Sequence, residues 1–232
     1  MSGAAVRPSD HPGASRSHRG YSGRPERPPV PALVEALLRR DEDAALGIAE
    51  RYVSRVGSRT AVFADLLQPA QAKLAELWYR NEIHSADELR AALIVARLVP
   101  GLPATPSIQQ AGLEHHCLLV VAKGDGHVLG VWMMGLALLD DGWEVELIEE
   151  ASDRDVAFAL AARRPRFLGL SSGYLPSSRP VSRLVALARA HRVPVLVGGP
   201  AFNRAPELWR QVGADGHAMD SRMGVVLARR YA

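Results

Sequence analysis

Asp125 and His127 are the side chains best placed for chemistry, because they lie in a turn between an expected strand and an expected helix. The apolar run 117–122 has the length of a buried strand, and the apolar run 131–139 has that of a helix. In open parallel sheets, ligands bind beyond the carboxyl ends of the strands. A carboxylate two residues before an imidazole can hold one ring nitrogen while the other binds a metal ion. The pair therefore indicates a metal ligand, although a cap or a solvated turn would also explain these residue types.

Two later turns end expected strands with small residues. The first strand ends in Ser171, with Gly173 two residues further on, and the second ends in the pair Gly198 and Gly199. Because the carboxyl ends of parallel strands share one edge of a sheet, we expect these residues to border the crevice that holds the first turn. Glycine leaves room for a bulky ligand to pass, and it equally serves tight turns.

The order of these residues resembles the signature of the cobalamin-binding domain family, which reads Asp-x-His-x-x-Gly, then Ser-x-Leu, then Gly-Gly. The resemblance spans about half of the chain and rests on Asp125, His127, Gly130, Ser171, Gly198 and Gly199. It implies that His127 ligates the cobalt of cobalamin from below and that Asp125 holds the other ring nitrogen. It also implies that the dimethylbenzimidazole tail leaves the metal and runs into the core past Ser171, Gly198 and Gly199.

The same resemblance implies further cofactor contacts. Gly126, Val128 and Leu129 complete the turn around His127. Gly173 stands where the family usually has Leu or Thr. This departure implies a wider channel for the nucleotide tail.

The chain divides into a helical part and an α/β part. Helical periodicity predicts a four-helix bundle, in which Pro69 is expected to kink or split the third helix. The later alternation of strands and helices predicts a doubly wound, parallel five-stranded sheet of flavodoxin-like order. The predicted helices are 32–40, 42–56, 61–79 and 85–99; the predicted strands are 117–122, 143–148, 166–171, 194–198 and about 213–217, before a last helix from Asp220.

The ends of two predicted helices carry capping signals. Asp41 is the expected N-cap of the second helix. Ser85, followed by Glu88, predicts a capping box at the start of the fourth, and Pro100-Gly101 is expected to stop that helix. We therefore expect a disordered tail (1–29), an all-α bundle cap (30–100), a linker (101–116) and a cobalamin-binding Rossmann-like domain (117–232).

The charge of the chain is concentrated near its N-terminus. The net charge of +3 is accounted for by residues 1–29, whose arginines outnumber their acidic residues, so the folded remainder is neutral. This distribution argues against direct DNA binding. No apolar run reaches the length of a membrane-spanning helix, and the single cysteine, Cys117, excludes an internal disulfide. We expect a cytoplasmic protein with no membrane association, and self-association into a homo-oligomer stays open.

The bundle ahead of the expected sheet implies a cap over the upper face of the cofactor, as in two branches of the family. Light sensors of this type carry a Trp and a downstream Glu-His pair on the cap; here Trp78 and Glu88 match, whereas Leu89 replaces the His. Trp78 would pack on the upper ligand and Glu88 would accept hydrogen bonds from it, although Trp78 also fits the bundle core at helical spacing from Leu74. His84 is the nearest other imidazole in the sequence.

These matches favour a non-enzymatic light sensor that binds adenosylcobalamin and signals to a regulatory protein partner. The short layout also resembles the photocobilins, which suggests biliverdin as a second chromophore. The alternative is a corrinoid methyl carrier of a methyltransferase system, although the Asp-Ile-Gly-Lys run typical of that branch is replaced by Val128-Leu129-Gly130-Val131. A cobalamin store or chaperone is the third hypothesis.

Overall fold

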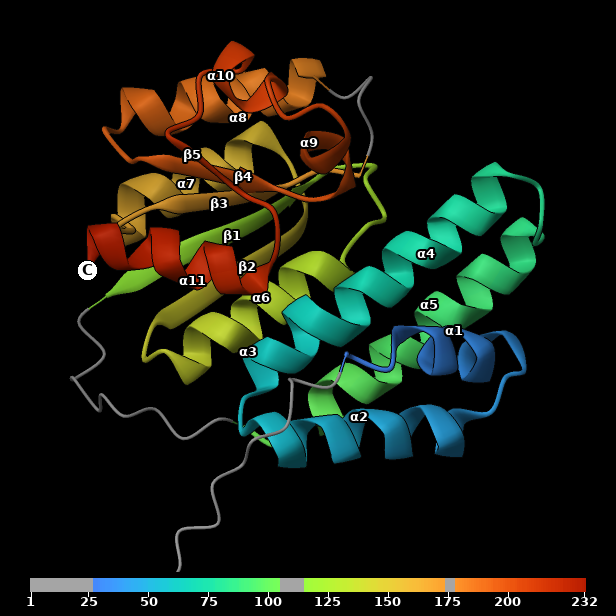
Figure 1. Cartoon of the computed structure of the whole chain (residues 1–232). Coiled ribbons are helices and arrows are strands. Elements are labelled where there is room, and N and C mark those ends of the chain that lie inside the picture. Colours follow the sequence, from blue (N-terminus) through green and yellow to red (C-terminus); the bar gives the residue numbers. More distant parts are fainter. Residues whose placement is uncertain (1–26, 105–114, 174–177) are drawn as a thin grey trace, which may run out of the picture.

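A helical bundle and a doubly wound sheet form the part of the chain that the structure describes, which comprises residues 27–104, 115–173 and 178–232 of a computed structural model (Figure 1). Most of the predicted tail and most of the predicted linker lie outside these ranges. No helix among the described residues is long and apolar enough to cross a bilayer.

The bundle forms where helical periodicity predicts it. The Asp41 carboxylate accepts a hydrogen bond from the backbone N–H of Ala44 at 2.9 Å, which confirms the expected N-cap. Gly57 ends the same helix in the left-handed conformation, with a φ of 66°. The helices are α1 (Val30–Leu38), α2 (Glu42–Val56), α3 (Arg59–Val62), the π-helical segment η1 (Phe63–Leu67), α4 (Gln68–Tyr79) and α5 (Ser85–Gly101).

Pro69 changes the form of the third helix without ending it. The π-helical segment η1 directly precedes α4, in which Pro69 is the second residue. Proline lacks a backbone N–H and its ring crowds the preceding turn, and a wider π-turn relieves both problems. The predicted interruption is therefore a local change of helical pitch within a continuous helix.

The predicted start of α5 at residue 85 is confirmed, but its predicted N-cap and its predicted end are wrong. Its N-cap is His84, one residue before the predicted Ser85, and the Asp87 carboxylate, in the position predicted for Glu88, accepts from the His84 backbone N–H at 3.4 Å. At the other end, the helix continues through Pro100 to Gly101. The buried side chains of Val99 and Leu102 hold this last turn against the core, which overrides the local stop signal.

The sheet has the predicted topology. Its strands lie in the order β2-β1-β3-β4-β5, and all neighbours pair in parallel, which confirms the flavodoxin-like doubly wound fold. The strands are β1 (His116–Ala122), β2 (Glu144–Ala151), β3 (Leu168–Ser171), β4 (Val195–Gly198) and β5 (Gly216–Ala218).

Helices cover both faces of the sheet (Figure 1). On one face, α6 (Leu129–Asp140) packs on β1 and β2, and α11 (Ser221–Ala228) packs on β5 and α6. Both helices also pack against the bundle, so one continuous apolar core joins the two modules. On the other face, α7 (Asp153–Arg163) and α8 (Ser178–Ala190) enclose a second core. The shorter helices α9 (Pro200–Arg204), α10 (Leu208–Gln211) and η3 (Arg229–Tyr231) complete this module. Because the bundle packs against α6 and α11, its α4–α5 end, where α4 is followed by α5, lies beside the carboxyl edge of the sheet (Figure 1).

Candidate functional site

The turn that carries Asp125 and His127 directly follows β1 at the carboxyl edge of the sheet. Gly124 takes a positive φ of 84° there, which glycine adopts without strain. The Gly124 backbone N–H donates to the Glu150 carboxylate at 3.0 Å. Glu150 itself has a φ of 51° at the end of β2, where the register with β1 shifts. The end of the neighbouring strand therefore anchors the turn.

The Asp125 carboxylate organises the site. Its Oδ1 lies 2.9 Å from His127 Nδ1 and accepts from the His127 backbone N–H at 3.3 Å. Its Oδ2 accepts from the Gly173 backbone N–H at 2.7 Å and from the Ser172 hydroxyl at 3.1 Å. This carboxylate thus joins the turn after β1 to the end of β3, and only 3% of Asp125 is exposed.

Asp125 is charged in this environment. Burial works against the carboxylate, but hydrogen bonds from the His127 ring and from the backbone N–H groups of Gly173 and His127 outweigh it and hold the pKa of Asp125 below its ordinary value. A charged acceptor at Nδ1 fixes the ring proton on that nitrogen.

The His127 ring is presented as a metal ligand would be. Its side chain is 42% exposed, although the carboxylate that holds it is buried. With the proton on Nδ1, the Nε2 atom carries the lone pair, and a carboxylate partner makes that nitrogen a stronger donor. Such a single nitrogen donor would suit a cobalt ion whose remaining ligands come from a macrocycle.

The glycines at the strand ends serve different purposes. Gly199 has a φ of 95°, and a Cβ there would lie 2.6 Å from the Ser172 carbonyl oxygen. A Cβ on Gly198 would lie 3.1 Å from the Ala218 carbonyl oxygen. Gly199 therefore needs glycine for both its backbone conformation and the close approach of neighbouring strand ends, whereas a side chain at Gly198 would be crowded. Around Gly126 and Gly130, by contrast, a Cβ would meet nothing within 4 Å.

Gly173 does not widen a channel as expected. A Cβ at this position would lie 2.1 Å from His127 Nδ1, because the imidazole ring already occupies that space. The structure thus brings His127, Asp125 and Gly173 together with Ser171 and the Gly198-Gly199 pair at one edge of the sheet.

Two residues at this site were missed from sequence. Ser172 bonds Asp125 through its hydroxyl, and Glu150 anchors Gly124. Ser172 follows a predicted strand end, a position that could have drawn attention to it. The placement of the Glu150 carboxylate depends on an irregular strand pairing and a positive φ, and the sequence gives no signal for either.

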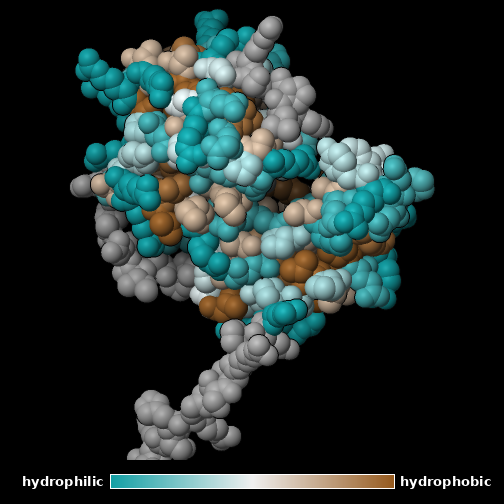
Figure 2. Space-filling model, turned by 45° about the horizontal axis from the view of Figure 1, so that its top comes forward, coloured by the Kyte–Doolittle hydropathy of each residue, from teal (hydrophilic) through white to brown (hydrophobic). Residues whose placement is uncertain are grey.

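Trp78 and Glu88 come from the bundle and lie at its α4–α5 end. Trp78 is 44% exposed, which excludes it from the bundle core, and its ring meets Tyr79 edge-on with centroids 5.2 Å apart. The Arg204 guanidinium of α9 lies 5.1 Å from the Tyr79 ring centroid, so the bundle end reaches the sheet module. Glu88 is half-buried, and Leu89 is 58% exposed. Figure 2 shows a hollow between the two modules, partly bordered by hydrophobic residues.

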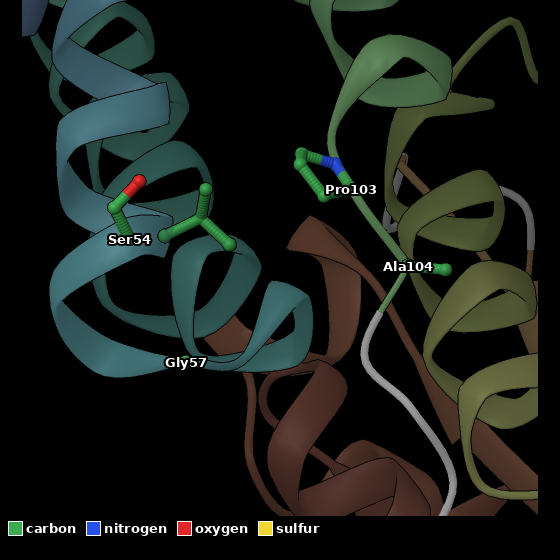
Figure 3. Close-up of a pocket in the computed structure, with 5 residues that line it drawn as sticks. Ser54, Gly57, Pro103 and Ala104 are labelled. Carbon is green, nitrogen blue, oxygen red and sulfur yellow. The ribbon is translucent and has the colours of Figure 1, made fainter.

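A separate pocket lies between the end of α2 and the segment after α5 (Figure 3). It has a volume of about 230 Å³ and is lined by Val53, Ser54, Gly57, Pro103 and Ala104. None of the predicted site residues contributes to it. Ser54 supplies its only polar side chain, so the lining offers little for orienting a cofactor.

Two family models match the chain. A B12 binding domain matches residues 115–226, and a second B12 binding domain matches residues 31–99. Curated protein sequences include no significant match.

Several solved structures resemble this chain, and the first of those that follow shares its fold. The monomethylamine corrinoid protein of Methanosarcina barkeri is 14% identical, with a TM-score of 0.72 over 86% of this chain and 96% of that chain. A cobalamin-binding protein from Desulfitobacterium hafniense is 20% identical, with a TM-score of 0.48 over 88% and 98% of the two chains. A chain of the methanol:cobalamin methyltransferase complex of M. barkeri is 15% identical, with a TM-score of 0.47 over 87% and 78%. Each of the two modules therefore matches a B12 binding domain model.

Proposed function

We propose that this cobalamin-binding protein is a corrinoid carrier of a methyl-transfer system and that a separate methyltransferase is its partner. When bound, the cobalt of cobalamin can take up and release a methyl group. The observation that carries the proposal is the half-exposed His127 ring, held by the buried Asp125 carboxylate at the edge of the sheet beside the bundle. In this proposal the chain binds and presents the cofactor, and it is not itself the enzyme.

Different residues of the sheet module would contact different parts of the cofactor. His127 would ligate cobalt through Nε2, and Asp125 would hold Nδ1 and increase the basicity of the ring. The Ser172 hydroxyl and the Gly173 backbone N–H keep the carboxylate in place. The turn residues Gly126, Val128, Leu129 and Gly130 would border the corrin, and Ser171, Gly198 and Gly199 would border the nucleotide tail.

The bundle supports the carrier over the predicted light sensor. Leu89, exposed on α5, supplies an apolar side chain where a sensor would need an imidazole to take the upper position. The nearest imidazole in the sequence, His84, is exposed and caps α5. The structural likeness to a monomethylamine corrinoid protein extends over both modules. An apolar upper face suits a site that must admit a methyl donor and acceptor in turn.

A light sensor is the second candidate, and it rests on Trp78 and Glu88. Trp78 is exposed at the bundle end and Glu88 lies one helix later, which agrees with the sensor spacing. In that case adenosylcobalamin would be the cofactor and a regulatory protein the partner. A second chromophore such as biliverdin would bind without a thioether, because Cys117 is fully buried in β1.

Reconstitution distinguishes these functions. The protein is loaded with adenosylcobalamin in the dark, and its absorption spectrum and hydrodynamic size are measured before and after illumination. A carrier is expected to keep its size in light, whereas a light-dependent change of size supports the sensor. His127→Ala should lose the spectrum of histidine-ligated cobalamin, and His191→Ala, at an exposed surface histidine, is the matched control. Failure of the wild type to bind cobalamin would refute both functions.

A second experiment distinguishes a methyl carrier from a cobalamin store. The bound cofactor is chemically reduced and offered methyl iodide, and the mixture is then passed through a desalting column. A carrier should retain the methylated cofactor with the protein. Release of the cofactor on methylation would favour storage or delivery.

A further inference from the structure

The backbone of Gly173 and the ring of His127 occupy adjoining space that no side chain at residue 173 could share. A Cβ built on Gly173 would lie 2.1 Å from Nδ1, 2.3 Å from Cγ and 2.7 Å from Cε1 of His127. Non-bonded carbon atoms normally approach to about 3.5–4.0 Å. Even alanine would therefore displace the imidazole.

The reason for glycine at this position is space, and not backbone conformation. Gly173 is absent from the glycines with positive φ, whereas Gly199 has a φ of 95°. Any residue could adopt the backbone of Gly173 without strain. The three atoms nearest to the Cβ position all belong to the His127 ring, so the requirement for glycine comes from this ring.

The Asp125 carboxylate holds the His127 ring and the Gly173 backbone against each other. Its Oδ1 holds the His127 ring, and its Oδ2 accepts from the Gly173 backbone N–H at 2.7 Å. Because Asp125 is buried and has bonds on both oxygens, it cannot follow the ring if the ring is pushed away. Displacement of the imidazole would therefore break its bond to Asp125.

We propose that Gly173 is a positioning residue for cobalt ligation, because its missing side chain lets His127 take the Asp125-bound orientation that directs Nε2 outward. This inference rests on the proposed role of His127 as the lower ligand. The orientation of the ring is then set by the backbone directly after β3 as well as by the carboxylate.

The first test uses the protein without cofactor. At one fixed pH, the ring ¹⁵N shifts of His127 show which nitrogen carries the proton. The wild type should be protonated on Nδ1, and Gly173→Ala should move the proton to Nε2. Gly101→Ala is the matched control, because Gly101 lies at the end of α5 with nothing within 4 Å of its Cβ position. An unchanged tautomer in Gly173→Ala would overturn the proposal.

The second test uses cobalamin and protein labelled with ¹⁵N-histidine. In the Co(II) form, an axial ¹⁵N ligand splits each paramagnetic resonance line into two, whereas the ¹⁴N of the nucleotide base gives three. The wild type should show doublets, and Gly173→Ala should lose them and bind cobalamin about 10–100-fold more weakly, as other losses of ligand support do. Doublets of full strength in Gly173→Ala would overturn the proposal. Absence of doublets in the wild type would refute His127 as the ligand, while the cofactor-free test still decides the steric claim.

A pair of backgrounds distinguishes a clash with the His127 ring from general misfolding. If the clash is with the imidazole, Gly173→Ala should lower the urea midpoint in the wild type but leave it unchanged in a His127→Ala background. An equal loss in both backgrounds would place the clash elsewhere and overturn the proposal.

Discussion

Arg59 and Asp140 form a buried two-point ion pair that joins the bundle to α6. Arg59 Nε lies 3.0 Å from Asp140 Oδ2, and Arg59 Nη2 lies 2.5 Å from Asp140 Oδ1. The two side chains are 8% and 7% exposed. The guanidinium also donates to the carbonyls of Leu102 and Leu136, both at 3.4 Å. Because α6 begins beside the His127 turn, this pair fixes the bundle to the far end of the helix that starts at the site.

Arg59→Met should therefore lower the free energy of unfolding substantially. The substitution leaves the Asp140 carboxylate buried without its guanidinium, and removal of one partner from a buried pair typically costs about 3–5 kcal/mol. Urea unfolding followed by circular dichroism measures the effect. Arg39→Met, which removes an exposed pair with Glu35, should change the same quantity by less than about 1 kcal/mol.

The double variant Arg59→Met/Asp140→Leu should recover part of this loss. An apolar pair of similar volume removes the uncompensated charge, and such replacements are often neutral or stabilising. If the double variant is as unstable as Arg59→Met, the loss comes from packing and the electrostatic account is wrong.

Asp125→Asn should weaken both the fold and cofactor binding. All four partners of the carboxylate are donors, so the amide NH₂ of Asn must face at least one of them. Loss of the support for His127 is expected to reduce cobalamin affinity about 10–100-fold. Titration of the protein with cobalamin, followed by absorbance, gives the affinity, and unchanged binding would count against a role for this carboxylate.

The stability contribution of Asp125 should depend on pH in one direction. Because the folded state lowers its pKa, the carboxylate stabilises the protein above the pKa of about 3.9 that Asp has when unfolded, and this contribution is lost as the pH falls through the lower folded pKa. The difference in unfolding free energy between wild type and Asp125→Asn should be constant from pH 7 to about 5 and shrink below about 4. If the difference in unfolding free energy grew as the pH fell, the folded state would raise the pKa of Asp125, and the prediction would be wrong.

Gly199→Ala should destabilise the protein more than Gly57→Ala. Both glycines have positive φ, but only at Gly199 would a Cβ also meet backbone, 2.6 Å from the Ser172 carbonyl oxygen. Gly57 has nothing within 4 Å, so Gly57→Ala measures conformational strain alone, on the order of 1 kcal/mol. The comparison by urea unfolding isolates the clash, and equal effects would argue against a close approach of β3 and β4 ends.

The sheet could be predicted from sequence because its central strands are uninterrupted apolar runs. Residues 117–122 and 194–198 match β1 and β4 closely, and their glycine-rich ends mark the crevice. The edge strand β2 extends to Ala151, beyond the predicted end at residue 148. The prediction ended this strand before Glu149 and Glu150, but an edge strand exposes polar residues and tolerates the irregular pairing found there.

The proposed metal ligand of the candidate site could be predicted from the sequence, but the residues that hold it in place could not. The spacing of Asp125 and His127 within one turn is enough to predict their contact. The bonds from Ser172 and Gly173 to Asp125 join segments 47 and 48 residues away, so they depend on strand order and register. The packing of the His127 ring on Gly173 is a property of three-dimensional space, which is why the sequence suggested an open channel at the same position.

Cys117 should be inert in the folded protein. Burial raises the pKa of its thiol to about 12, with a smaller contribution from Glu144, and the side chain is fully buried in β1. At pH 8 this pKa would leave about one thiolate in ten thousand, and only the thiolate attacks disulfide reagents. Native protein should therefore show no reaction with Ellman's reagent, whereas protein in denaturing urea should release one equivalent. Rapid labelling of the native protein would mean that β1 opens readily, and it would contradict the inference that a bilin cannot attach to Cys117.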